Sequence, residues 1–356
     1  MADGLQELLK QMVEWKASDL HLSAGEPPHL RIDERLLPLE QPPLISQQIY
    51  DMIATVTSPE RLEKFKQELE LDFSFSVEHL GRFRVNVFYQ RGHVGAAIRA
   101  LPEHIRTFEE CGLPGKTMVD LCRRPRGLVL VTGATGSGKS TTMASMVDWI
   151  NTERPCHIVT VEDPIEYLHR NKRALVDQRE VDADTRSFAQ ALKHMLRQDP
   201  NVILIGELRD LETIEAALNI AETGHLVFAT LHTSDCVQTI NRVIDVFPAH
   251  AQNQVRVQLS FVLLGVFAQQ LVPMADGRGR SLAAEIMLVN HAIRALVRES
   301  KAHQIYSVIQ TSQREGMRTM NQAFFELVTD GRISIEEARS RSTDPEDLDR
   351  LFKRTS

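Results

Sequence analysis

The sequence predicts an α/β protein in which a smaller α+β module precedes a core built on a mostly parallel sheet. Four continuous apolar runs alternate with helical segments, which is the pattern of parallel strands buried on both faces. Strict apolar–polar alternation in the first hundred residues indicates the α+β module. In addition, one apolar run leads through a glycine-rich turn into helix-forming residues. The four apolar runs are residues 128–131, 157–161, 202–205 and 226–230.

The bulk composition is that of a globular protein of about two domains. Of the 356 residues, 42% are apolar and 25% charged, and no apolar run reaches the roughly 18 residues that span a bilayer. The acidic start lacks the basic-then-apolar order of a signal peptide, so we expect a cytoplasmic protein with no transmembrane segment. The net charge of −7 disfavours a nucleic-acid partner without excluding a local basic groove. Four widely spaced cysteines favour reduced thiols over zinc or disulfides.

The expected elements divide the chain into a first domain at 1–101, a linker at 102–126 and a core domain at 127–356. Proline and glycine gather around a helical patch in the linker. Beyond residue 248 we expect helices, interrupted by a hairpin with its turn at 276–279. The charged stretch 344–356 is expected to be a loosely held helix. The first domain is expected to contain helices at 5–13, 45–53 and 59–69 and strands at 19–22, 29–32, 36–39, 71–77, 82–90 and 95–101.

The glycine-rich turn carries the clearest chemistry. Gly133, Gly138, Lys139 and Ser140 match the P-loop spacing G-x-x-x-x-G-K-[ST]. Glycines let backbone N–H groups curl around phosphate oxygens, and the following helix presents its positive end to the anion. Lys139 is expected to reach the β- and γ-phosphates of ATP, and the Ser140 hydroxyl to bind Mg²⁺. An ordinary glycine-rich turn is the alternative, but the flanking strand and helix favour nucleotide binding. The expected nucleotide-binding residues are Gly133, Thr135, Gly136, Ser137, Gly138, Lys139, Ser140 and Thr141.

Two carboxylates follow apolar strands of the core. Glu207 comes after the run 202–205, although Gly206 stands where an acid usually follows directly. Glu207 is therefore expected to act on the metal, directly or through water. Glu162 ends another strand, which Pro164 terminates, and could orient and deprotonate the attacking water. The alternative for each glutamate is a solvated turn after the strand, with no role in binding or catalysis. Because ligands bind beyond the carboxyl ends of parallel strands, the P-loop favours the functional interpretation.

Histidines and arginines give weaker candidates. His225 and His232 flank the run 226–230 and could sense the γ-phosphate, but neither lies in a metal-binding spacing. A hydrogen-bonded core histidine is the commoner outcome for such a residue. Arg82 and Arg84 share one face of a strand, and Arg99 lies on the next one. These arginines could be surface charges, or could reach a phosphate in a neighbouring subunit as arginine fingers do.

Taken in order, these segments resemble the secretion ATPase superfamily of GspE and VirB11 type, and specifically the PilT-type retraction ATPases of type IV pili. The resemblance extends from the first helix to about residue 341. A helical segment at 292–299 resembles the signature Ala-Ile-Arg-Asn-Leu-Ile-Arg-Glu of PilT-type proteins, from which Ala295 and Val297 depart. The remaining segments match Walker A at 133–141, the Asp box at 160–166, Walker B at 202–210 and the His box at 224–233.

This resemblance implies a PAS-like first domain, a RecA-like P-loop ATPase core with a helical C-terminal region, and a ring of six subunits. It implies that Glu162 is the general base and Glu207 the acid at the Mg²⁺ site. His225 and His232 would couple the nucleotide to domain movement, and arginines of the first domain would close over the nucleotide at a subunit interface. The ring would work at the cytoplasmic face of the inner membrane, against a platform protein, and pull pilin subunits back into the bilayer.

Several alternatives remain open from the sequence. Within the superfamily, the chain could be a PilU-like accessory motor, or an extension or secretion ATPase. A paralogous retraction ATPase is a further candidate partner. Extension motors usually carry a tetracysteine zinc site, and the chain has no such cluster. A RecA-like nucleic-acid motor is disfavoured by the acidic balance and the lack of an aromatic and basic stripe. A regulatory protein that binds nucleotide without turnover is disfavoured by the two glutamates.

Overall fold

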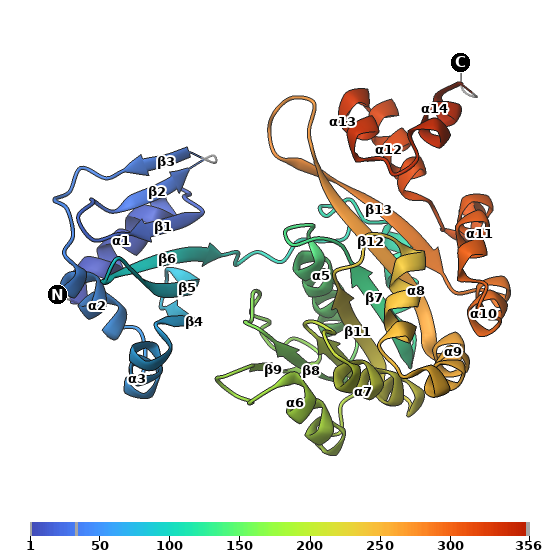
Figure 1. Ribbon diagram of the computed structural model, residues 1–356, viewed down its shortest axis with the longest axis horizontal. Helices are drawn as coiled ribbons and strands as arrows, with labels where there is room; N and C mark the ends of the chain where they lie inside the picture. Colours follow the sequence, from blue (N-terminus) through green and yellow to red (C-terminus); the bar gives the residue numbers. More distant parts are fainter. Residues whose placement is uncertain (1, 33–34, 354–356) are drawn as a thin grey trace. The chain divides into compact units, whose positions relative to one another are not determined.

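The computed structural model describes residues 2–32 and 35–353 of the chain (Figure 1). The chain forms two compact units. The first comprises Met1–His104 and Pro164–Leu168, and the second comprises Ile105–Asp163 and His169–Ser356. None of the helices in the described ranges combines the length and the apolarity needed to cross a membrane.

The first unit is an antiparallel six-stranded sheet with the order β3-β2-β1-β6-β5-β4. Alternation along β5 places Phe83, Val85 and Val87 in the apolar core, where they are fully buried against the helices of this unit. The expected α+β module is confirmed. Its elements are α1 (Ala2–Glu14), β1 (Asp19–Leu22), β2 (His29–Ile32), β3 (Arg35–Pro38), α2 (Ser46–Ala54), α3 (Pro59–Glu68), β4 (Glu70–Val77), β5 (Gly81–Gln90) and β6 (His93–Leu101).

The second unit is a seven-stranded sheet with the order β13-β12-β7-β11-β10-β8-β9. All neighbouring strands are parallel except β12 and β13, which form the expected hairpin. The strands are β7 (Gly127–Thr132), β8 (His157–Glu162), β9 (Leu175–Glu180), β10 (Val202–Ile205), β11 (Leu226–Leu231), β12 (Leu263–Pro273) and β13 (Arg280–Leu288). The helices are α4 (Gly115–Cys122), α5 (Lys139–Glu153), α6 (Phe188–Met195), α7 (Leu211–Glu222), α8 (Cys236–Asp245), α9 (Ala249–Val262), α10 (His291–Arg298), α11 (Ile305–Thr311), α12 (Met320–Thr329), α13 (Ile335–Arg341) and α14 (Pro345–Lys353).

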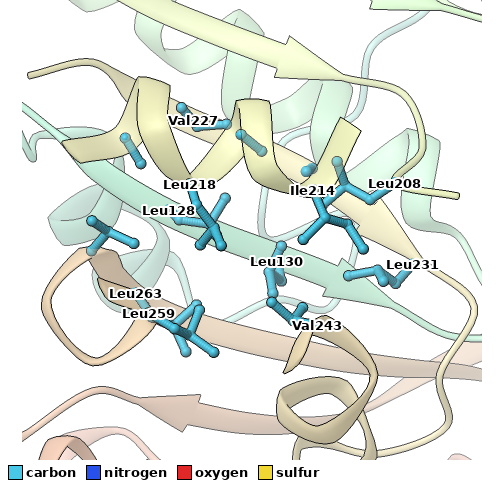
Figure 2. Close-up of a cluster of buried hydrophobic side chains, with 14 of the residues drawn as sticks. Leu128, Leu130, Leu208, Ile214, Leu218, Val227, Leu231, Val243, Leu259 and Leu263 are labelled. Atoms are coloured by element: carbon cyan, nitrogen blue, oxygen red, sulfur yellow. The ribbon is translucent and has the colours of Figure 1, made fainter. Parts of the chain in front are cut away.

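Two apolar cores cover the two faces of this sheet, as the continuous apolar runs predict. One core joins the sheet to helices α6 to α11, and the other joins it to α4 and α5. Figure 2 shows part of the first core, where Leu128 and Leu130 of β7 pack among Leu218 of α7 and Leu259 of α9. Because residues along β7 alternate between the two cores, its backbone is fixed on both sides. The residues that follow β7 are therefore held in one position.

Two parts of this unit differ from the sequence expectation. Strand β9 was not expected, because Leu175–Glu180 is largely polar and lies at the edge of the sheet. The expectation of a loosely held terminal helix is wrong for α14, since Leu348 is fully buried in a core with α12 and α13. The buried carboxylate of Asp347 also accepts hydrogen bonds from Tyr306 (3.1 Å) and Asn321 (3.1 Å). Residues 354–356 lie outside the described residues.

We expect Leu348→Ala to lower the free energy of unfolding by about 2–5 kcal/mol, because it leaves a cavity in a closed core. Glu346→Ala, at an exposed position two residues earlier, is the matched control, with an expected change of less than about 0.5 kcal/mol. Denaturant titration of the three proteins measures both effects. Equal stability of the two variants would show that α14 is not held by its apolar face.

Candidate functional site

The P-loop connects β7 to α5 and depends on glycine where the backbone passes close to β12. Gly133 has φ +139°, and a Cβ there would lie 2.4 Å from the carbonyl oxygen of Gln269 and 2.6 Å from Ser137 Oγ. Gly138 has φ +92° and is the last residue before α5 begins at Lys139. A left-handed residue at this position turns the chain so that the first N–H groups of the helix face the loop. This geometry is suited to binding an anion.

Lys139 is oriented towards the same loop. Its Nζ donates hydrogen bonds to the carbonyl oxygens of Gly133 (2.8 Å) and Ala134 (3.1 Å). The ammonium group is thus positioned where the loop could bind phosphate. Ser140 and Thr141 follow in the first turn of α5, where their hydroxyls are near the same end of the helix.

A cavity of about 340 Å³ adjoins the loop and adds residues that sequence reasoning missed. Its walls include Ser234, after β11, Gln269 on β12, and two arginines, Arg280 and Arg341. Ser137 Oγ and Gln269 Oε1 are buried and have no hydrogen-bond partner among the described residues, so both could bind a ligand or water. The wall residues outside the loop come from segments far apart in the sequence, and no local motif identifies Ser234, Gln269, Arg280 or Arg341.

The carboxyl ends of β8, β10 and β11 bring the acidic and histidine candidates together. Glu207 Oε1 lies 3.3 Å from His232 Nε2, and Glu207 Oε2 lies 2.9 Å from Arg209 Nη2. Arg209 also lies 3.6 Å from Asp163. Burial alone would raise the pKa of Glu207, but the hydrogen bond and charge of Arg209, with a smaller effect of His232, hold this pKa below its ordinary value. Glu207 therefore remains a carboxylate.

The backbone at Gly206 lies close to the end of β8. The N–H of Gly206 donates to the carbonyl oxygen of Val161 at 2.8 Å. A Cβ at Gly206 would lie 3.1 Å from that oxygen and 3.2 Å from the Cα of Glu162. A side chain at this position would press on the end of β8, so glycine fits here, and the first carboxylate after β10 belongs to Glu207.

Glu162 is oriented by two side-chain donors. Its Oε1 accepts hydrogen bonds from Thr160 Oγ1 (2.7 Å) and Gln178 Nε2 (3.2 Å). Gln178 lies on β9, and its own oxygen accepts from the N–H of His169 at 2.8 Å, which directs the amide nitrogen to Glu162. Thr160 is fully buried. Glu162 is therefore fixed in direction at the same edge of the sheet as Glu207.

His225 lies away from these residues. It precedes β11, whereas His232 follows it, so the strand separates the two histidines by about 20 Å. His225 Nδ1 lies 3.1 Å from the carbonyl oxygen of Ile220 and 3.2 Å from Thr223 Oγ1. Any effect of His225 on the P-loop would have to pass through β11 and its neighbours.

The three arginine candidates belong to the first unit and lie on the polar face of its sheet. Arg84 is directly opposite Arg99 across β5 and β6, and Arg82 lies two residues before Arg84 on the same face. Arg99 is paired with Asp19 at 2.7 Å, yet its side chain remains 66% exposed. Arg82 donates to Ser74 Oγ. These guanidinium groups gather on one face of this unit.

This chain is similar to known proteins over nearly its whole length. The profile of the family described as type II/IV secretion system protein matches residues 2–340. The type IV pilus retraction ATPase PilT of Pseudomonas aeruginosa is 48% identical over 97% of this chain and 99% of its own length. The type IV pilus ATPase PilU of the same organism is 40% identical over 98% of this chain and 91% of its own.

A solved structure agrees over nearly the whole fold. The crystal structure of the pilus retraction motor PilT with bound ADP has a TM-score of 0.91 and 50% identity, and covers 97% of this chain and 98% of its own. An α/β fold with a P-loop core and C-terminal helices, as expected from the sequence, is thereby confirmed.

We expect Arg209→Ala to raise the pKa of Glu207, because burial then acts on the carboxyl without the opposing guanidinium. A higher pKa means that the carboxylate is lost at a higher pH. The acid limb of the pH profile of ATP hydrolysis, the activity named for the relatives above, should therefore move to higher pH. Arg209→Lys, which keeps a positive charge, should move it less. Identical acid limbs in all three proteins would contradict the role given to Arg209.

Proposed function

This chain belongs to the type II/IV secretion system protein family and is of the PilT type within it, and we propose that it is the ATPase that powers retraction of type IV pili and twitching motility. One observation carries the proposal. The P-loop, Glu162 and Glu207 meet at one edge of a parallel sheet, in a chain that matches a pilus retraction ATPase over nearly the full length of both. Hydrolysis of ATP to ADP and phosphate is the chemistry that these groups fit.

The residues of the core have separate tasks in this proposal. The loop Gly133–Thr141 binds the phosphates through its N–H groups, and Lys139 neutralises their charge. The Ser140 hydroxyl and the Glu207 carboxylate are oxygen donors of the kind Mg²⁺ prefers, so they would hold that ion. When bound, Mg²⁺ would neutralise the charge that develops on the phosphates. Glu162, held by Thr160 and Gln178, orients the attacking water.

The mechanical part of the proposal requires neighbouring subunits. Six copies form a ring, and Arg82, Arg84 and Arg99 of one copy close over the γ-phosphate bound by the next. Hydrolysis removes these charge-assisted contacts, so the favoured angle between the two parts of a copy changes. In this proposal the parts are a PAS-like domain at 1–101 and a RecA-like domain at 127–356, with the linker 102–126 as hinge. His232, beside Glu207, and His225, through β11, transmit the state of the nucleotide.

The proposal also assigns a place of action. The ring is cytoplasmic and works at the cytoplasmic face of the inner membrane, against the platform protein of the pilus. A paralogous retraction ATPase is a further candidate partner. Support for these assignments comes from the relatives, which are named as ATPases of type IV pili.

Two core variants test the chemistry. Lys139→Ala should abolish nucleotide binding or turnover, because the phosphates lose their main cation. Glu207→Gln should still bind ATP but hydrolyse it at least about 100-fold more slowly, since a neutral amide supports the metal poorly. Binding of a fluorescent ATP analogue and release of phosphate measure the two effects.

Normal hydrolysis by both variants would show that the site assignment is wrong. A wild-type protein that binds ATP without releasing phosphate would instead indicate a regulatory nucleotide-binding protein. Stimulation of hydrolysis by DNA or RNA at physiological salt would favour a nucleic-acid motor. Each of the three classes thus gives a different result.

Deletion of the gene distinguishes a retraction motor from a PilU-like accessory protein. We expect the deletion strain to carry surface pili, to lack twitching, and to recover it when the wild-type gene, but not Lys139→Ala, is supplied. Fluorescently labelled pili allow retraction events to be counted. Retraction that persists in the deletion strain would overturn the assignment as the retraction motor.

A further inference from the structure

Glu285 is an acidic residue in the interior of the second unit. It lies on β13 and is 3% exposed. One carboxylate oxygen accepts a hydrogen bond from the N–H of Cys236 at 2.8 Å, and the other accepts from the N–H of Met320 at 3.4 Å. Burial raises the pKa of this carboxyl, and hydrogen bonds from the N–H and thiol of Cys236 and from the N–H of Met320 counteract part of the rise.

Both donors are the first residues of helices. Cys236 begins α8 after the cap residue Asp235, and Met320 begins α12 after the cap residue Thr319. The first N–H groups of a helix have no partner within the helix, and its positive end favours a carboxylate. Glu285 therefore joins the starts of two helices that are 84 positions apart in numbering (320 − 236) and belong to different parts of the unit.

One of these helices follows directly from the nucleotide-facing edge of the core. The segment between β11 and α8 contains His232, which lies 3.3 Å from Glu207, and Ser234, which lines the cavity beside the P-loop. Across the sheet, Glu285 pairs with Ala268, and Ala268 pairs with Thr132, the residue before the P-loop. Glu285 thus lies level with the start of the P-loop and holds the helix that follows His232.

The other helix belongs to the C-terminal group. Helix α12 packs with α13 and α14 around a shared apolar core (Figure 1). The last residue of α13, Arg341, is a wall of the same cavity. The C-terminal helices are therefore connected to the site twice, through Arg341 and through the N–H of Met320.

We propose that Glu285 is a positioning residue of the ATPase site. Its two carboxylate oxygens link the start of α8 to the start of α12, so that the C-terminal helices hold the His232–Asp235 segment against the P-loop. This inference rests on the proposed ATPase function. Glu285 touches neither nucleotide nor water in it. Loss of the link through Glu285 should therefore slow hydrolysis, because hydrolysis requires the His232–Asp235 segment in its position. Nucleotide affinity should remain nearly unchanged.

Proline substitution can remove the N–H donor of each hydrogen bond to Glu285 separately. Proline is well tolerated at the first position of a helix, where it deletes only the N–H. The residues before both positions are extended, as proline requires: ψ is 170° at Asp235 and 164° at Thr319. Met320→Pro and Cys236→Pro each remove one of the two backbone hydrogen bonds to Glu285. Met320→Ala and Cys236→Ala remove the side chains but keep the N–H groups, and so are matched controls.

We expect each proline variant to have a kcat about tenfold below that of its alanine control, as the loss of one hydrogen bond to a buried carboxyl group predicts. The Kd for a fluorescent ADP analogue should change by less than about twofold, roughly 0.4 kcal/mol. Because either substitution alone breaks the link between the two helices, the kcat of the double proline variant should be no lower than that of either single variant. A merely structural role would lower the melting temperature without this split between kcat and Kd.

Glu285→Gln provides a second route if a proline variant does not fold. The amide can accept only one of the two N–H groups, so the same loss of kcat is expected. Glu336→Gln, at an exposed position of α13, should have no effect. Proline and alanine variants with equal kcat, or losses that add in the double variant, would overturn the inference. A wild-type chain without ATPase activity would instead overturn the proposed function, so the two failures are distinguishable.

Discussion

The central constraint in this molecule is the close approach of the P-loop to the neighbouring strand β12. At Gly133 the space between the loop and the Gln269 carbonyl oxygen admits no side chain, since a Cβ would lie 2.4 Å from that oxygen. The loop is therefore held by the sheet itself, and α5 begins where the loop ends. Because β8, β10 and β11 run parallel to β7, their carboxyl ends bring Glu162, Glu207 and His232 to the same edge.

A second close contact lies at Gly206, directly before Glu207. Gly206 is so near the end of β8 that a side chain would press on its backbone, and the carboxylate is supplied one residue later. Arg209 then keeps Glu207 ionised, and His232 contacts its other oxygen. Strand packing thus favours glycine at position 206, before the carboxylate of Glu207. The same reasoning applies to Glu285, whose burial between two helix starts makes it a candidate link between the C-terminal helices and the site.

The sequence predicted those parts of the fold and site whose signals are local. Continuous apolar runs identified the central strands, and the P-loop spacing identified the loop, because both depend on neighbouring residues. Strand β9 was missed because an edge strand needs few apolar residues, and with it Gln178, the donor to Glu162. Arg280 and Arg341 reach the cavity through a hairpin and a distant helix, so only the folded chain reveals them. Helix α14 is buried through a single apolar face, which is hard to recognise because most of its residues are charged.

The most decisive experiment is a structure of the assembled protein with Mg²⁺ and a non-hydrolysable ATP analogue. We expect a triphosphate enclosed by the loop from Gly133 to Thr141, with Glu162 and Glu207 near its terminal phosphate. At least one of Arg82, Arg84 and Arg99 should reach that phosphate from a neighbouring copy. A nucleotide bound far from Lys139, or enclosed by one polypeptide with no neighbour in contact, would contradict it.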